Sequence, residues 1–227
     1  YMVLAIGENL PTRAMVDELA TEERFHQLLE KTNDYWSEKL DKVRAYTGDS
    51  RRDNWSRWVS LQPILRRLMG NSFLPYHDYG RGGRGWRDLW QDALGLLLLE
   101  SDEISEMLHA YFAGVRMDGS NATIIGSQPG EFKADRNEIP RVWMDHGVWP
   151  LKTLEMYLEL TGDYPFLLRE QTYFRDHLTH RTKQKDLKWR DKDSDVQTTI
   201  SGKPYLGSIF EHLLVQHLTT FFNAGDN

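Results

Sequence analysis

Apolar residues recur every three or four positions along most of this chain, which predicts a largely helical protein. The spacing predicts one helix over residues 13–46, begun by Pro11 and Thr12, and a second over residues 53–69. Pro63 lies inside the second helix and is expected to kink it, because proline lacks the backbone N–H that a helix interior needs. The same pattern predicts further helices over residues 87–99, 102–116, 147–161, 164–179 and 206–222.

The segments between these helices are polar or rich in glycine, and long ones cover residues 70–86, 118–142 and 180–205. Only residues 1–6 have the pattern of a strand. Long loops that alternate with helix pairs favour a toroid of helix pairs over a bundle, whose helices are joined by short connections. A fixed-period repeat is absent, which disfavours a solenoid. The pattern therefore predicts an all-α fold built from helical hairpins.

The composition limits the classes of protein that fit this pattern. With 40% apolar residues, a chain of 227 residues can bury a substantial core. The formal net charge of −6 provides no basic field for nucleic acid, and no apolar run approaches the ~20 residues of a membrane span. The absence of cysteine excludes disulfides and thiolate metal sites. The chain begins without Met and stops just after an apolar run, so we expect a piece of a longer protein.

The segment at residues 86–92 combines two tryptophans with an arginine, an amide and two carboxylates. Burying such charges without partners is costly, so this mixture indicates ligand binding rather than core. Arg87 and Gln91 are four residues apart, as are Asp88 and Asp92, so the polar groups share neighbouring helix faces. A structural interpretation, acids in a first turn that favours negative charge, explains Asp88 alone. Aromatic faces beside hydrogen-bonding groups suit a sugar, and carbohydrate chemistry is the first hypothesis.

A second cluster lies at residues 143–149, just before the helix predicted from residue 147. Asp145 lies between Trp143 and Trp149 and next to His146. Flanking rings can raise the pKa of a carboxyl by desolvation, which is what a general acid near neutral pH requires. An aspartate that caps the helix N-terminus explains the same position equally well. The local pattern leaves both interpretations open.

The loop Gly-Arg-Gly-Gly-Arg-Gly at residues 80–85 contains the letters of a dinucleotide fingerprint but lacks the buried strand that must precede one. It fits a flexible turn, or a loop that folds over an anion such as phosphate through its amides, Arg81 and Arg84.

The remaining histidines are isolated, and neither a metal-ligand spacing nor a serine nucleophile elbow occurs. The mixed charges of residues 183–193 indicate a solvated loop, with Trp189 as a candidate contact for a long substrate.

Taken together, Arg-Asp-x-x-Gln-Asp at residues 87–92, Trp-x-Asp at 143–145 and Trp149-Pro150 resemble the inverting glycoside phosphorylases of glycoside hydrolase family 94. That family includes cellobiose, chitobiose and 1,2-β-oligoglucan phosphorylases and the phosphorylase-like module of cyclic β-1,2-glucan synthases. The longer stretch at residues 139–150 is most similar to the 1,2-β-oligoglucan phosphorylases. The resemblance is clear over roughly residues 70–180.

The resemblance implies a catalytic (α/α)6 barrel preceded by a β-sandwich and a helical linker. Residues 1–48 would be the end of the sandwich and the linker, and residues 49–227 the N-terminal part of the barrel. The implied partners are a β-glucan oligosaccharide and inorganic phosphate as co-substrate, without a further cofactor, a metal, nucleic acid or a membrane span. A bacterial cytoplasmic location is expected, and a homodimer is one expected state of the full-length protein.

The resemblance also assigns roles to individual residues. The general acid of the family corresponds to Asp145, and the groups that hold the sugar correspond to Arg87, Asp88, Asp92 and Trp143. Position 146 departs from the family, since His146 stands where other members often have Asp. A phosphorylase needs no catalytic base, because phosphate is already anionic and attacks C1 itself. The full expected substrate site comprises Arg87, Asp88, Gln91, Asp92, Trp143, His146 and Trp149, with Arg81 and Arg84 as a separate hypothesis for phosphate.

Two other classes of function remain open. An inverting hydrolase on the same barrel, similar to glucoamylase or trehalase, would need a second catalytic carboxylate to activate water. A non-catalytic helical module that binds carbohydrate would show sugar binding without turnover, unaffected by the change Asp145→Asn.

Overall fold

The computed structural model describes residues 12–69, 84–99, 104–125, 132–133, 144–177, 189–190 and 194–219. These residues are mostly helical, with short strands, which is compatible with the expected all-α class. The chain divides into two compact units, Tyr1–Arg57 and Trp58–Asn227. The predicted β-strand at residues 1–6 lies outside the described residues.

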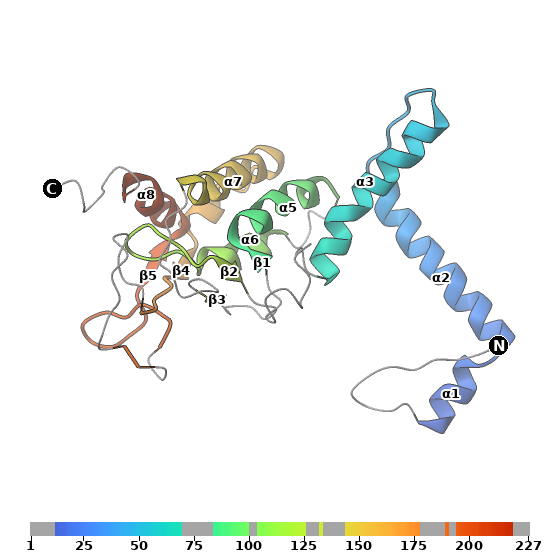
Figure 1. Cartoon of the computed structure of the whole chain (residues 1–227), viewed down its shortest axis with the longest axis horizontal. Helices are drawn as coiled ribbons and strands as arrows, with labels where there is room; N and C mark the ends of the chain where they lie inside the picture. The colour runs from blue at the N-terminus through green and yellow to red at the C-terminus, as the bar shows by residue number, and fades with distance from the viewer. Residues whose placement is uncertain are drawn as a thin grey trace. The chain divides into compact units, whose positions relative to one another are not determined.

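The first unit contains α1, Arg13–Leu19, and α2, Glu22–Asp41 (Figure 1). The prediction of a single helix over residues 13–46 is therefore wrong. Thr21 adopts an extended backbone conformation, and its hydroxyl accepts the backbone N–H of Arg24, so it begins a new helix. Residues with high helix propensity and the apolar spacing continue on both sides of Thr21. The sequence pattern alone therefore does not reveal the break between α1 and α2.

The chain then turns into α3, Ser50–Met69, which begins three residues earlier than predicted. Asp49 caps this helix, because its carboxylate accepts the backbone N–H of Arg51 at 2.9 Å. Asp53 in the first turn accepts from the backbone N–H and the hydroxyl of Thr47 at 2.9 and 2.7 Å, which ties the preceding loop to the helix. Pro63 lies inside α3, as its position in the sequence predicts.

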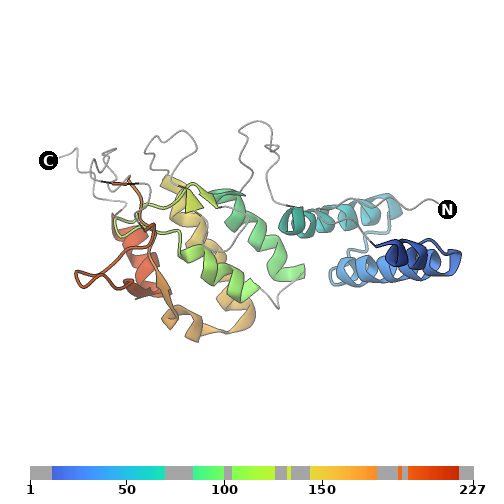
Figure 2. The same cartoon turned by 90° about the horizontal axis from the view of Figure 1, so that it is seen from below.

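The second unit contains α5, Trp86–Leu99; α6, Ile104–Phe112; α7, Val148–Thr161; and α8, Ile209–Thr219. Helix α5 packs against α6 and α7, and α8 packs against the same two helices, as Figures 1 and 2 show. The starts of α5 and α7 agree with the predicted helices to within a residue. Glycine at position 95 allows α3 to approach α5, since a Cβ there would lie 2.7 Å from Pro63 Cγ.

Trp90 lies at the centre of the core of this unit. Its ring makes edge-on contacts with Trp86, Tyr111 and Phe112, with centroids 5.0 to 5.7 Å apart. The other buried apolar side chains of the four helices surround this cluster: Leu89, Ala93, Leu96, Leu97, Leu99, Ile104, Leu108, Leu154, Tyr157, Ile209 and Leu213.

The prediction of a helix over residues 164–179 is wrong. Gly162, in the left-handed conformation with φ 69°, ends α7, and a short 3₁₀ helix, η3, follows at Tyr164–Leu168. Strand β4, Glu170–Thr172, then pairs antiparallel with β5, Leu206–Ser208, directly before α8. The partner strand lies more than thirty residues further along the chain, so the local spacing does not reveal the pairing.

Two more segments differ from the prediction and help to position the site. Helix α6 ends at Phe112 rather than near residue 116, and the chain turns so that Val115 bridges Asn121. Within the expected loops, β1, Arg84–Gly85, pairs with β2, Ile124–Ile125, which pairs with β3, Phe132–Lys133. This small sheet holds the segment after residue 120 beside the start of α5.

Candidate functional site

The structure brings the two sequence clusters together at the N-terminal ends of α5 and α7. Arg87, the second residue of α5, donates from Nη1 to Asp145 Oδ2 at 3.1 Å across 58 positions of sequence. Asp145 lies in the 3₁₀ turn η2, Met144–His146, which leads into α7. Both side chains keep access to solvent, with 47% of Arg87 and 39% of Asp145 exposed. An ion pair that a ligand can reach therefore joins the two motifs.

Asp145 does not cap α7. The N-cap residue is Gly147, which makes no side-chain capping bond, and α7 begins at Val148. The interpretation of Asp145 as an N-cap residue is therefore wrong, and its carboxylate points instead toward Arg87.

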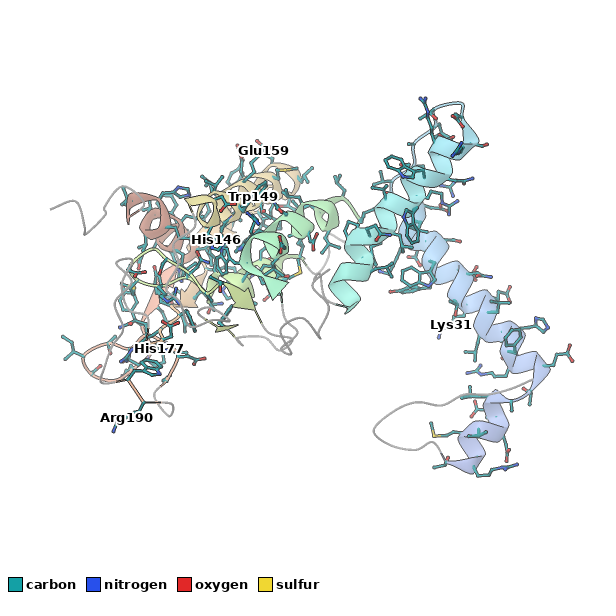
Figure 3. The ribbon with its side chains drawn as sticks, in the orientation of Figure 1. Lys31, His146, Trp149, Glu159, His177 and Arg190 are labelled. Carbon is teal, nitrogen blue, oxygen red and sulfur yellow. The ribbon has the colours of Figure 1, made fainter. Side chains whose placement is uncertain are left out.

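His146 is fixed on two sides. The indole nitrogen of Trp86 donates to the His146 carbonyl oxygen at 2.9 Å, and the amide nitrogen of Asn121 lies 3.1 Å from His146 Nδ1. In Figure 3, His146 and Trp149 lie where the start of α7 meets α5. The turn that carries Asp145 is thus attached both to the buried core and to the loop after α6.

The electrostatics of the resting site differ from the expectation of a raised acid pKa. Burial raises the pKa of the Asp145 carboxyl, but the hydrogen bond and charge of Arg87 lower it by more, so the net pKa is below its usual value. Asp145 is therefore ionised at neutral pH in this state. Burial lowers the pKa of His146 to about 4, with Asp145 opposing and Arg87 adding to the shift, so His146 is neutral.

The two tryptophans of the first cluster do not offer faces to a sugar. Trp86 is 1% exposed and Trp90 is 0% exposed, and both belong to the aromatic core. This part of the carbohydrate argument is wrong. A helical period places residues 86 and 90 on the same face as Leu89 and Ala93, so burial of that face explains both rings.

The other predicted site residues have different settings. Asp88 is exposed in the first turn of α5, where a carboxylate is favoured by the helix dipole, and its Oδ1 lies 3.9 Å from Arg87 Nε. Gln91 and Asp92 are partly buried one turn further along α5. Trp149 is partly buried in the first turn of α7. Arg87, Asp88 and Asp145 therefore form the solvent-accessible centre of the candidate site.

Three predicted contacts cannot be placed. Arg81 and Trp143 lie outside the described residues, as does the side chain of Arg84, whose backbone belongs to β1. Among the residues that the structure describes, no group of three or more His, Asp or Glu side chains is arranged to hold a metal ion.

The sequence analysis missed a buried polar network next to this site. Arg116 donates to both carboxylate oxygens of Asp176 at 3.2 and 2.7 Å and to the backbone carbonyl of Asn121 at 2.6 Å. Arg116, Asn121 and Asp176 are each less than 10% exposed. The residues 118–121 carry only a turn pattern in the sequence, and Asp176 lies 60 positions beyond Arg116, so no local signal identifies the network.

Comparison with known proteins gives no family assignment: neither a protein-family model nor a curated protein matches this chain. Within the described part of the chain, each helix is too short or too polar to cross a membrane.

Proposed function

We propose that this chain carries the acid and part of the sugar-binding site of an inverting β-glucoside phosphorylase, with β-1,2-glucooligosaccharides as the preferred substrate. The observation that supports this most directly is the Arg87–Asp145 ion pair, which joins the two motifs of the family 94 resemblance at one solvent-accessible point. The helix pairs of the second unit would then belong to an (α/α)6 barrel. The enzyme would be cytoplasmic and would need no cofactor other than its phosphate co-substrate.

In the proposed reaction, Asp145 transfers its proton to the glycosidic oxygen as the bond between that oxygen and C1 breaks. A phosphate oxygen attacks C1 from the opposite face, so the configuration inverts and the products are α-glucose 1-phosphate and a shortened chain. Asp145 is left as a carboxylate and takes up a proton before the next turnover. A single carboxyl suffices, because phosphate replaces the water that a hydrolase must activate with a base.

The resting ion pair has a direct consequence for this mechanism. An acid whose pKa is held low by Arg87 cannot donate a proton efficiently, so Arg87 must move its charge away before the reaction. A sugar hydroxyl that accepts from Arg87 would do this, because the guanidinium has several donors and can turn toward the ligand. Burial would then raise the pKa of Asp145 with less opposition. Substrate binding and activation of the acid are coupled through one side chain.

The surrounding groups suit a sugar ring. Asp88 offers a carboxylate and Arg87 a fork of N–H donors on the same exposed turn, and charged partners make strong hydrogen bonds to hydroxyls. Gln91 and Asp92 of α5 and Trp149 of α7 are partly buried, and we propose that they complete the sugar site. Trp143 would form a wall of the sugar site, and Arg81 and Arg84 would contact phosphate.

The test uses the full-length protein with sophorose oligomers or cellobiose, with and without inorganic phosphate, and measures glucose 1-phosphate and free glucose. We expect glucose 1-phosphate only with phosphate, and a loss of about 10²- to 10⁴-fold in Asp145→Asn. Glu159→Gln, which changes an exposed acid on α7, the helix that follows Asp145, is the matched control and should retain full activity. Glucose released without phosphate would indicate the hydrolase, and sugar binding without turnover would indicate a carbohydrate-binding module.

A further inference from the structure

The loop between α6 and β2 places one side-chain amide against the imidazole of His146. Asn121 Nδ2 lies 2.6 Å from the backbone carbonyl oxygen of Ala122 and 3.1 Å from His146 Nδ1. The carbonyl oxygen can only accept, so it determines that the amide nitrogen, not the amide oxygen, occupies this position. The second hydrogen of the amide then faces Nδ1. This contact requires a lone pair on Nδ1, and a neutral imidazole with a lone pair on Nδ1 carries its proton on Nε2.

We infer that Asn121 is a positioning residue that holds His146 as a hydrogen-bond donor, with the ring proton on Nε2 and the Nδ1 lone pair engaged. The consequence for catalysis rests on the proposed function, whereas the tautomer itself does not. His146 directly follows the proposed acid. Its protonation pattern decides whether it can act as a base or only as a hydrogen-bond donor.

The loop that carries Asn121 is itself held in place. Arg116 donates to the Asn121 carbonyl at 2.6 Å and to the Ser120 hydroxyl at 3.1 Å, and its guanidinium is fixed by two bonds to Asp176. The ring of Phe174 lies 4.9 Å from the same guanidinium. These bonds fix the backbone of Asn121, and the bond from its amide to the Ala122 carbonyl orients the side chain toward His146.

The charges around the ring agree with a neutral donor. Asp145 precedes His146 and favours the imidazolium, whereas burial and the charge of Arg87 oppose it. Burial is the largest effect, so His146 stays neutral from about pH 5 upward.

This assignment bears on the choice between the proposed reaction and hydrolysis. An inverting hydrolase needs a base to take a proton from water, and a histidine next to the acid is a candidate for that role. With Nδ1 engaged by Asn121 and a proton on Nε2, His146 has no lone pair left for water. The neutral ring can therefore act only as a donor through Nε2, which excludes it as the base.

The first experiment measures the tautomer directly in the full-length protein labelled with ¹⁵N-histidine. Long-range ¹H–¹⁵N correlation spectra distinguish the two protonated forms, and the spectrum of His146→Gln identifies the signals of His146 among those of the other histidines. We expect Nε2–H across pH 6 to 8. A proton on Nδ1, or a doubly protonated ring at pH 7, would overturn the inference without the need for any variant at position 121.

The second experiment asks whether Asn121 acts through His146. Asn121→Ala should lower kcat/KM by about tenfold, the effect of losing one oriented hydrogen bond. The same change in a His146→Gln background should have no further effect, whereas an equal loss in both backgrounds would show that Asn121 does not act through the ring. Separate KM values for phosphate and for the oligosaccharide show on which substrate the loss falls.

Met117→Ala is the matched control, because it changes an exposed side chain of the same loop and leaves the bonds of Arg116 and the amide of Asn121 in place. It should leave the spectrum of His146 unchanged. Asn121→Asp puts a carboxylate opposite Nδ1, and it should draw a proton onto that nitrogen and raise the pKa of the ring. If the wild-type protein forms no glucose 1-phosphate, the proposed function fails, and the spectra still decide the tautomer.

Discussion

The indole nitrogen of Trp86 donates to the backbone carbonyl oxygen of His146 at 2.9 Å. Trp86 is fully buried and packs against Trp90, so this bond attaches the turn that carries Asp145 to the core of the second unit. Gly114 makes room for the ring, since a Cβ there would lie 2.7 Å from Trp86 Cζ3. In the sequence, Trp86 suggested a ring that stacks on a sugar. In the structure it is instead a buried side chain that holds the turn carrying Asp145.

Trp86→Phe should separate this aligning role from core packing. Phenylalanine keeps an aromatic ring but lacks the N–H, so the carbonyl of His146 loses its donor. We expect a loss of about 1–3 kcal/mol in the free energy of unfolding, measured by urea denaturation, together with a lower kcat/KM. Trp90→Phe is the control: its ring lies in the same core but makes no bond to His146. Equal effects of both variants on kcat/KM would contradict an aligning role for Trp86.

The Arg87–Asp145 pair predicts a difference between two pH profiles. A general acid must be protonated, so the rate falls as pH rises through its pKa. Arg87 lowers the pKa of Asp145 in the free protein, whereas in the complex the sugar draws Arg87 away. The alkaline fall in kcat/KM, which reports the free protein, should therefore occur at lower pH than the fall in kcat.

Variants at position 87 provide the comparison. In Arg87→Gln the alkaline falls in kcat/KM and in kcat should occur at the same pH, because the charge that lowers the pKa of Asp145 is gone. Overall activity should decrease with the loss of sugar contacts. Arg87→Lys keeps the charge and should keep the separation. Ionisation of phosphate affects all three proteins alike. Coincident profiles in the wild-type protein would argue against the coupling.

The sequence predicts some parts of this molecule well for a physical reason. Helices α5 and α7 have an apolar face that repeats with the helical period over fourteen residues each, and this signal is contained within the segment itself. The pairing of β4 with β5 and the contact between Asn121 and His146 depend on partners far along the chain, so spacing does not encode them. The same holds for the pKa of Asp145, which is set by Arg87 rather than by the neighbouring rings.

Lowering the pH should destabilise the second unit through His146. Its pKa is about 4 in the folded protein and about 6.5 in an unfolded chain, so between these values the unfolded state binds more protons. Stability is therefore lost as pH falls from 6.5 to 4, by at most about 3 to 4 kcal/mol for this residue, since each pKa unit corresponds to about 1.4 kcal/mol. Burial lowers the pKa of His212 as well, which adds to the loss in the same direction.

Urea denaturation at several pH values measures this effect. His146→Gln should flatten the dependence between pH 6.5 and 4. Asp145 acts in another window, because a carboxyl whose pKa is lowered on folding loses its contribution only below its usual pKa range. A wild-type protein equally stable at pH 7 and pH 4.5 would contradict the low pKa of His146.

The buried pair of Arg116 and Asp176 should be the most sensitive polar contact in the second unit. Their side chains are 8% and 10% exposed, and removing one partner of such a pair leaves a buried charge without compensation, which costs about 3–5 kcal/mol. Asp176→Ala should show this loss in urea denaturation. Glu155→Gln removes one partner of the exposed Lys152–Glu155 pair and should change stability little.

Buried ion pairs can often be replaced by two apolar residues without loss, but Arg116 also holds the Asn121 carbonyl. The double variant Arg116→Met, Asp176→Leu should therefore remain destabilised and shift the His146 tautomer. Full stability with an unchanged histidine spectrum would show that the pair acts independently of the site.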